Sequence, residues 1–199
     1  YCFSTLLGDY SWQWLPKIIP ILMLLFIVQQ KMKTLDMKKG NVFILGLIFC
    51  LGGDVFLAVD RENLFVFGLG SFLVGHLFYI YSLVPIMKQN KLGLVLLTAY
   101  GAIIMTLLLP ELHELTIPVV AYMMVLLAMT AATMLSKLSN VWLILGGVSF
   151  TISDSLIGLN KFLISIPYSG FFIMLTYYLA QYALVKGFMN SHSSDLPKQ

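Results

Sequence analysis

Residues 41–59 read NVFILGLIFCLGGDVFLAV, an almost uninterrupted apolar run with one aspartate, Asp54, near its end. A run of about 20 apolar residues forms a helix of roughly 30 Å, which matches the hydrocarbon core of a bilayer. A carboxylate in such a run is costly, because its charged form is unfavourable in hydrocarbon. The stretch therefore predicts a transmembrane helix whose Asp54 faces the interior of the protein rather than lipid.

The whole chain has the composition of a membrane protein. Of its 199 residues, 59% are hydrophobic and only 11% are charged, and the mean hydropathy is +0.91. A soluble domain with a hydrated surface carries about twice that share of charged residues. Apolar stretches predict membrane spans at residues 12–30, 41–59, 64–87, 92–109, 117–136, 141–159 and 167–188. We therefore predict an all-α fold, a polytopic transmembrane helical bundle of seven helices, or of eight if residues 1–8 form a further helix.

The connections between these spans are short, and none is a Ser-, Pro- or Gly-rich linker. We expect a single transmembrane helical domain at residues 1–190, followed by a polar C-terminal tail at residues 191–199. Cys2 and Cys50 are far apart and have no histidine at metal-ligand spacing, so we expect neither a disulfide framework nor a metal site. The segment LPELHELTIP at 109–118 lacks the HExxH spacing and predicts a solvated turn.

Positive charges are distributed unequally between the two ends of the predicted bundle. One end carries Lys31, Lys33, Lys38, Lys39, Lys88, Lys91, Lys137, Lys186 and Lys198, and the other carries Lys17, Arg61 and Lys161. Because Lys and Arg are enriched in cytoplasmic loops, we predict that the first end is cytoplasmic. The loops near 60–63, 110–116 and 160–166 are then outside the cytoplasm, and with eight helices both termini are inside it.

A second aspartate, Asp154, interrupts an apolar run in the segment TISDSLIGLN at residues 151–160. Asp54 and Asp154 each lie about 13 residues into a predicted helix, and both helices run outward from the cytoplasmic end. At 1.5 Å per residue, each carboxyl group is roughly 20 Å from that end. We therefore expect the two aspartates to line one polar cavity in the non-cytoplasmic half of the bundle.

The surroundings of the two aspartates are similar. A small residue precedes each aspartate, a polar residue (Asp60 or Asn160) follows six positions later, and the next helix carries polar residues at mid-depth. These mid-depth residues are His76 and Tyr79 in the first unit and Tyr178 and Gln181 in the second. Because the paired helices are four positions apart in the order of spans, they run in the same direction, and the pattern is consistent with a parallel internal repeat.

The mid-membrane polar residues also have structural explanations. Asp54 and Asp154 could hydrogen-bond to neighbouring helices, and His76 could bridge two helices. Tyr178 and Gln181 are too deep for an interfacial aromatic belt, but they could pack in the core. A structural role and a functional role therefore both stay open for each of these residues.

The polar residues nearer the outer surface have structural explanations as well. Lys17 could extend its ammonium group to the interface, Asn160 could cap a helix, and Lys161 could be a solvated charge. The small-xxx-small spacing that is typical of close helix contacts occurs at Gly68, Ser71 and Gly75. We assign that spacing to packing rather than to chemistry.

Several of these segments together resemble a known family. The segments are GDVFL at 53–57, GHLFY at 75–79, ISDSLIGLNKF at 152–162, PYS at 167–169 and TYYLAQ at 176–181. With Lys17 followed by Pro20, they are similar to the YhhN-like family of integral membrane proteins, which includes the animal lysoplasmalogenases. The resemblance covers residues 12–187, and the tract at 88–140 adds little to it.

The resemblance implies an ether hydrolase that cleaves the vinyl ether bond of lysoplasmalogen to a fatty aldehyde and glycerophosphoethanolamine or glycerophosphocholine. That reaction needs an acid to protonate the β-carbon and an anion to stabilise the oxocarbenium ion that water captures. We expect Asp54 and Asp154 to supply them, as two carboxyl groups do in glycoside hydrolysis, with Asp154 as the acid. No metal or organic cofactor is required.

The other candidate site residues are expected to bind substrate or to support the carboxyl groups. Lys17 and Lys161, at the outer level, would bind the phosphate of the lysolipid. The residues expected to orient water or support the ionised aspartate are His76, Tyr79, Asn160, Tyr178 and Gln181. The expected partners are a lysophospholipid substrate and membrane lipids, not nucleic acid, and the expected location is a bacterial inner membrane or a eukaryotic endomembrane.

A proton-coupled transporter or lipid carrier is the alternative, because paired intramembrane acids and internal repeats also occur in proton relays. Against it, no predicted helix is broken by paired Gly and Pro at mid-depth. Aldehyde release by the purified protein in detergent would separate the two functions, since transport needs two compartments and hydrolysis does not.

Overall fold

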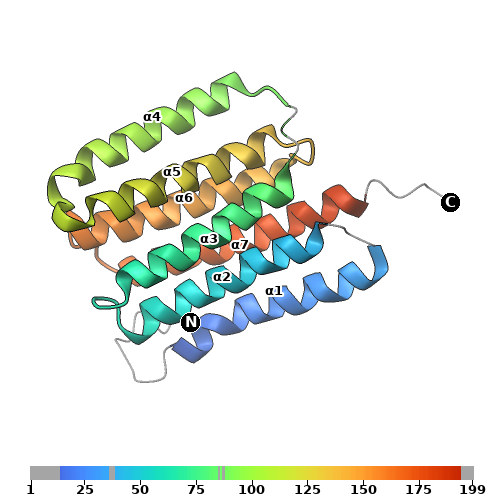
Figure 1. Ribbon diagram of the computed structural model, residues 1–199, viewed down its shortest axis with the longest axis horizontal. Coiled ribbons are helices and arrows are strands. Elements are labelled where there is room, and N and C mark those ends of the chain that lie inside the picture. The colour runs from blue at the N-terminus through green and yellow to red at the C-terminus, as the bar shows by residue number, and fades with distance from the viewer. Residues whose placement is uncertain (1–13, 36–38, 85, 87, 194–199) are drawn as a thin grey trace.

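The computed structural model describes residues 14–35, 39–84, 86 and 88–193. In these residues the chain forms seven α-helices, and successive helices run in opposite directions (Figure 1). They are α1 (Trp14–Leu35), α2 (Gly40–Val59), α3 (Phe65–Leu83), α4 (Lys91–Leu108), α5 (Thr116–Leu135), α6 (Val141–Phe162) and α7 (Ser169–Ser193). Two short 3-10 helices, η2 (Leu109–Glu111) and η3 (His113–Leu115), connect α4 to α5. The predicted eighth helix at 1–8 lies outside the described residues.

Six of the helices form a closed ring. Going around it, α1 packs on α2, α2 on α3, α3 on α5, α5 on α6, α6 on α7, and α7 on α1. Helix α4 lies outside this ring against α5 and α6, at the top of Figure 1. The most extensive pairings are α6 with α7 and α2 with α3. These pairs are also the two units of the predicted internal repeat, which stays a prediction.

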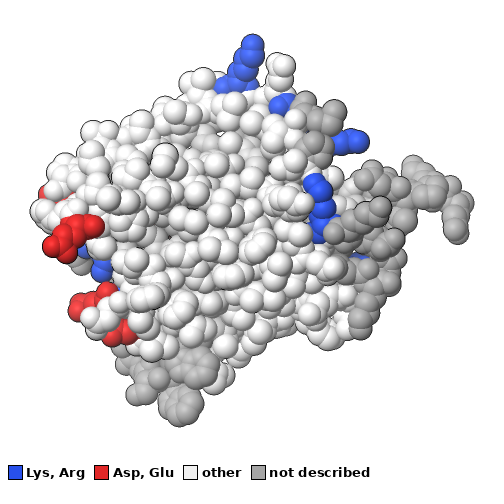
Figure 2. Space-filling model, in the orientation of Figure 1, with Lys and Arg blue, Asp and Glu red and all other residues white. Residues whose placement is uncertain are grey.

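Within the described residues, six helices, α2 to α7, are long and apolar enough to cross a membrane. Large apolar side chains such as Leu92 and Ile117 are exposed on the outside of the bundle, where lipid would cover them. Figure 2 shows a broad band without charged side chains, with basic residues at one end and most acidic residues at the other. The predicted polytopic helical bundle is confirmed, whereas which end is cytoplasmic stays a prediction.

Three helices extend at least three residues beyond the C-terminal end of their predicted span, and one helix ends earlier than predicted. Helix α1 continues to Leu35 rather than 30, α6 to Phe162 rather than 159, and α7 to Ser193 rather than 188. Polar residues such as Gln and Lys continue a helix readily beyond the apolar core of a membrane. Helix α3 ends at Leu83 rather than 87, because Val84 is extended (φ −69°, ψ 141°) as residues before proline usually are.

Glycines allow the closest helix contacts in the ring. In α2 and α3, a Cβ atom added to Gly75 would lie 3.0 Å from the carbonyl oxygen of Gly46. In α6 and α7, a Cβ atom added to Gly187 would lie 2.6 Å from the backbone nitrogen of Leu143. The backbones of each pair therefore approach more closely than any larger residue permits, as expected for small-residue contacts in membranes. The assignment of Gly75 to packing is confirmed.

Candidate active site

Asp54 and Asp154 line one cavity near the end of the bundle that carries few lysines. Its volume is about 430 Å³. The side chains around it come from α1, α2, α3, α6 and α7, and from the loop that follows α2. Its polar lining residues are Lys17, Asp54, Arg61, Ser153, Asp154, Ser169 and Tyr177. The two aspartates are on helices that run in the same direction, α2 and α6, at similar positions along them, and they share this cavity as the sequence predicts.

Asp54 is buried and paired with a lysine. Asp54 is only 2% exposed. The Nζ atom of Lys17 lies 3.1 Å from its Oδ1 atom. The same ammonium group donates a hydrogen bond to the Asp54 carbonyl oxygen at 3.2 Å. Among the described residues the buried Oδ2 atom has no hydrogen-bond partner of ordinary geometry, although the Tyr177 hydroxyl lies near enough to interact with the carboxylate. Asp54 therefore has one oxygen that Lys17 neutralises and one that can still accept a hydrogen bond.

Lys17 is fixed in this position by α7. The hydroxyl group of Tyr178 donates a hydrogen bond to the carbonyl oxygen of Lys17 at 2.9 Å. This bond holds the first turn of α1 against α7, next to the cavity. Lys17 is 8% exposed, so its ammonium group points inward to Asp54 instead of extending to the interface. The alternative of a snorkelling lysine is therefore wrong for this residue.

Asp154 has a different partner. The hydroxyl group of Tyr122 on α5 donates a hydrogen bond to its Oδ2 atom. The ion pair of Lys17 and Asp54 is the only salt bridge among the described residues, so Asp154 is not paired with a cation there. A neutral hydroxyl group stabilises the charged form of a carboxyl group less than an ammonium group does. The two carboxyl groups thus share a cavity but differ in electrostatic surroundings.

A chain of hydrogen bonds lies behind the cavity. The Tyr79 hydroxyl donates to Gln181 Oε1 at 2.7 Å, and Gln181 Nε2 donates to the Tyr177 hydroxyl oxygen at 3.2 Å. Tyr177 lines the cavity, whereas Tyr79 and Gln181 do not. All three are buried. The amide of Gln181 therefore fixes the position of a cavity residue rather than contacting a ligand.

His76 is fully buried and lies outside the cavity lining. Neither of its ring nitrogens has a hydrogen-bond partner among the described residues. Its ring packs edge-on against Phe150, with centroids 4.5 Å apart, and lies 5.6 Å from the ring of Tyr122. Tyr122 thus contacts both His76 and Asp154. The expected direct contact of His76 with water in the cavity stays a prediction.

Asn160 and Lys161 are on the last turn of α6, and neither lines the cavity. The Asn160 side chain accepts a hydrogen bond from the Ile166 backbone nitrogen at 2.9 Å and so shapes the loop before α7. Lys161 Nζ lies 4.6 Å from the centroid of the Phe65 ring, in a cation–π contact. These positions follow from the extra turn of α6, which the sequence analysis places in a loop.

Three residues of the site are not among those predicted from the sequence. Tyr122 is on α5, in a tract that reads as generic apolar helix. Tyr177 precedes the predicted Tyr178 in TYYLAQ, and Arg61 was considered only as a charge for topology. A tyrosine hydroxyl at mid-depth needs a hydrogen-bond partner, and this requirement was the available signal for both tyrosines.

A smaller apolar cavity of about 40 Å³ lies on the other side of Asp154. It shares Leu57, Phe72, Asp154 and Ile157 with the polar cavity. Its remaining lining is almost entirely apolar and comes from α3, α4, α5 and α6. Asp154 therefore lies on the wall between a polar and an apolar space. Within the described residues there is no group of three or more His, Cys, Asp or Glu side chains that could hold a metal ion.

Comparisons with known proteins agree with this picture. The model of the YhhN family matches residues 12–188. A lysoplasmalogenase of Mycobacterium tuberculosis is 32% identical over 151 residues, which cover 71% of this chain and 58% of that protein. Human lysoplasmalogenase TMEM86A is 35% identical over 147 residues, covering 68% of this chain and 60% of that protein. Mouse lysoplasmalogenase TMEM86B is 33% identical over 125 residues, covering 61% and 52%. The chain thus spans less than two thirds of each relative, and no solved structure matches it.

Proposed function

The chain belongs to the YhhN family, and from this premise we propose that it is a membrane-embedded lysoplasmalogenase. It would hydrolyse the vinyl ether bond of a lysoplasmalogen to a fatty aldehyde and glycerophosphoethanolamine or glycerophosphocholine. Relatives of that printed name, at 32% and 35% identity, support the proposal. The observation that carries it is a cavity with two carboxyl groups, of which, among the described residues, only Asp54 is paired with a cation.

The unequal surroundings assign different tasks to the two carboxyl groups. Lys17 favours the carboxylate form of Asp54, because an opposite charge at 3.1 Å stabilises it. Asp154 lies against an apolar space and has only the Tyr122 hydroxyl as a partner, which favours its neutral form. Asp154 is therefore the acid and Asp54 the anion, as in enzymes that separate two carboxyl groups by environment.

The reaction then proceeds in balanced steps. Asp154 transfers its proton to the β-carbon of the vinyl ether, and the resulting oxocarbenium ion is stabilised by Asp54. Water adds to the cationic carbon and gives one proton to the Asp54 carboxylate. The hemiacetal collapses when its hydroxyl proton returns to Asp154 and the departing glycerol oxygen takes the proton from Asp54. Both residues are restored, and no cofactor is consumed.

The lining residues suggest how the substrate lies. The apolar cavity beside Asp154 suits the hydrocarbon next to the double bond, while the polar cavity suits the glycerol and headgroup. Arg61, on the loop at the cavity mouth, is available to the phosphate, since its guanidinium group can donate two parallel hydrogen bonds. Lys17 is engaged by Asp54, so we assign phosphate binding to Arg61 first. By the positive-inside rule this mouth opens to the non-cytoplasmic side.

A substrate panel on the purified protein tests the proposal. Vinyl ether, alkyl ether and ester lysolipids of equal chain length are compared in detergent, with free aldehyde and free fatty acid as the readouts. We expect aldehyde from the vinyl ether alone, because only that bond yields a stabilised cation on carbon protonation. Cleavage of the ester without the vinyl ether would contradict the reaction class. Lysolipid movement across proteoliposomes without any aldehyde would favour the transporter instead.

A further inference from the structure

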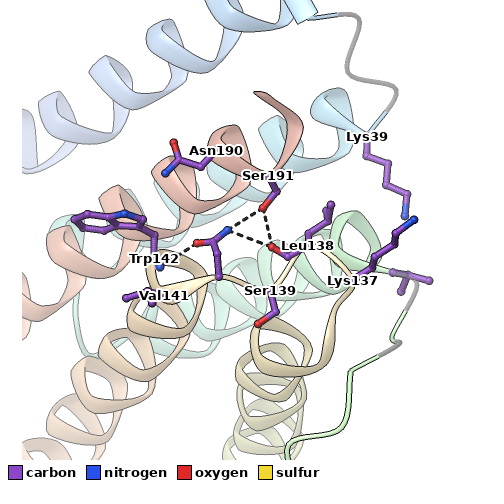
Figure 3. A pocket seen from close by; sticks show the side chains of 10 residues that line it. Lys39, Lys137, Leu138, Ser139, Val141, Trp142, Asn190 and Ser191 are labelled. Atoms are coloured by element: carbon purple, nitrogen blue, oxygen red, sulfur yellow. Dashed lines mark hydrogen bonds between the residues drawn. The ribbon is translucent and has the colours of Figure 1, made fainter. Parts of the chain in front are cut away.

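A second polar cavity lies at the opposite, lysine-rich end of the bundle. Its volume is about 620 Å³ (Figure 3). It is formed where the start of α2, the α5–α6 connection and the end of α7 meet. The polar side chains around it belong to Lys39, Lys137, Ser139, Asn140, Trp142, Asn190 and Ser191. The length of the bundle separates it from the aspartates, so it has no part in the proposed chemistry.

Lysines dominate the charge around this cavity. Lys39 and Lys137 line it, and Figure 3 shows both side chains extending toward the same side of the cavity. Lys88 lies at its edge and donates a hydrogen bond to the Ser139 carbonyl oxygen at 2.6 Å. The Nζ atom of Lys186 lies 3.7 Å from the Trp142 ring centroid. None of the described residues that line the cavity is acidic, so the side chains described there give it a positive potential.

The scaffold of the cavity is already hydrogen-bonded. Asn140 accepts bonds from the backbone nitrogens of Trp142 and Leu143 and donates to the Gly187 carbonyl oxygen. It also bonds to Ser191, which Figure 3 shows as part of a connected group. Asn140 therefore fixes the wall and has no capacity left for a ligand. The ammonium groups of Lys39 and Lys137 make no ion pair with a described residue, and they are the charged donors on the described wall of the cavity.

The cavity lies at the boundary between the polar end and the lipid-facing surface. Val141, on its wall, is 77% exposed and begins the apolar surface of α6. Trp142 beside it is the aromatic type that is enriched at the level of lipid headgroups, and Lys186 stacks on it. A molecule in the cavity would thus meet cations on one side and hydrocarbon on the other.

We propose that this cavity binds the phosphate headgroup of an anionic phospholipid from the adjoining leaflet. Lys39 and Lys137 neutralise the phosphate, Trp142 lies beside the glycerol region, and an acyl chain lies along the exposed face that starts at Val141. An anion between the two lysines also relieves the repulsion of two like charges at one cavity. The site is a structural lipid site, distinct from the substrate site at the other end.

Native mass spectrometry of the full chain tests this proposal. The protein is purified with phosphatidylglycerol or phosphatidylcholine, and lipid retention is measured during delipidation. We expect one phosphatidylglycerol to be retained, and Lys39→Gln with Lys137→Gln to weaken its binding by roughly 10- to 30-fold. The double variant Lys39→Arg with Lys137→Arg should keep the lipid, because its charges remain. If the glutamine double variant does not fold, Lys137→Gln alone should show a smaller loss in the same direction.

The matched control removes two lysines from the same end that do not line the cavity, Lys31 and Lys91. Lys31→Gln with Lys91→Gln should retain phosphatidylglycerol within about twofold of the parent. Equal losses in both double variants would show unspecific charge attraction and overturn the proposal. Equal retention of phosphatidylcholine, or competition by millimolar inorganic phosphate as strong as by the lipid, would overturn the assignment to an anionic lipid.

Discussion

At the scale of single residues, the proposed chemistry depends on the difference between Asp54 and Asp154. One has an ammonium group at 3.1 Å, and the other has a tyrosine hydroxyl. Both surroundings are built by residues from other helices, Lys17 on α1 and Tyr122 on α5. The division of labour between two chemically identical groups is therefore made by packing, not by the local sequence around each aspartate.

Replacing Lys17 with methionine tests the ion pair. Lys17→Met leaves Asp54 buried without its cation, so we expect a loss of about 3 kcal/mol in the free energy of unfolding and loss of turnover. Adding Asp54→Asn should restore much of the stability but not the turnover. Lys161→Met, at the same end but stacked on Phe65 outside the cavity, should cost less than about 1 kcal/mol. Reversible unfolding in detergent gives these values, and a Lys17→Met protein as stable and active as the parent would contradict the pairing.

Asp60 provides a pH-dependent test outside the membrane span. The side chain and backbone of Asn63 donate hydrogen bonds to its carboxylate at 2.7 and 2.9 Å, and they lower its pKa. Because the folded pKa is lower than the unfolded one, its stabilisation is present above the unfolded pKa and is lost as the pH falls through the folded one. Asp60→Asn should lower the Tm slightly at pH 7, and the difference from the parent should shrink as the pH falls below the pKa of an unfolded aspartate. A difference that stays constant with pH would contradict this role.

The residue-level predictions succeed or fail for identifiable reasons. Asp54 and Asp154 could be found because a carboxyl group in an apolar run is unusual. The contact of Lys17 with Asp54 joins residues 37 positions apart, and no periodicity indicates it. Tyr122 lies in an apolar tract, so only the folded arrangement shows that its hydroxyl reaches Asp154.

At the scale of helices, the pair α6 and α7 carries much of the site. Asp154 is on α6 and Tyr177 is on α7, and the two helices make one of the most extensive contacts in the bundle. A small displacement between them would move the acid relative to the cavity wall. The close approach at Gly187 and Leu143 is therefore a requirement for site geometry as well as for stability.

Gly187→Ala tests this contact. The new Cβ atom would lie 2.6 Å from the Leu143 backbone nitrogen, so the helices must separate, and we expect a loss of about 1 to 3 kcal/mol together with reduced turnover. Gly70→Ala is the matched control, because nothing lies within 4 Å of a Cβ atom there. It should change stability by less than about 1 kcal/mol. Equal effects of the two substitutions on the Tm would contradict the packing account.

The ends of the helices are harder to predict from the sequence than their existence. Hydropathy identified all seven helices because each contains a long apolar run. The ends of α1, α6 and α7 lie in polar sequence, where hydropathy carries no signal and helix propensity decides. The early end of α3 could have been predicted from Pro85, which disfavours helix at Val84.

At the scale of the whole molecule, the two proposed sites lie at different ends of the bundle. The cavity with the aspartates lies toward one end of the bundle, and the lysine-lined cavity lies at the other. The positive-inside rule then predicts that substrate enters from the non-cytoplasmic leaflet, while the anionic lipid is bound from the cytoplasmic one.

Cysteine labelling in intact cells tests this orientation. In a background without Cys2 and Cys50, an impermeant reagent should label Asn63→Cys, in the loop beside the aspartate cavity, but not Lys91→Cys at the other end. Both variants should be labelled after the membrane is permeabilised. The reverse labelling pattern would show the inverted membrane topology, with the proposed site in the cytoplasmic half.

The central claim, that Asp54 and Asp154 act together on a vinyl ether, is tested most directly by kcat for aldehyde release in Asp54→Asn, Asp154→Asn and the double variant. The asparagine side chain keeps the shape but can neither protonate carbon nor act as an anion. We predict a loss of 10² to 10⁴-fold, about 3 to 5 kcal/mol, in each single variant with lysolipid binding retained. The double variant should lose much less than the sum, because groups that act as a unit are not additive. A single variant that keeps more than about a tenth of the parent kcat would contradict the account and assign that aspartate to structure.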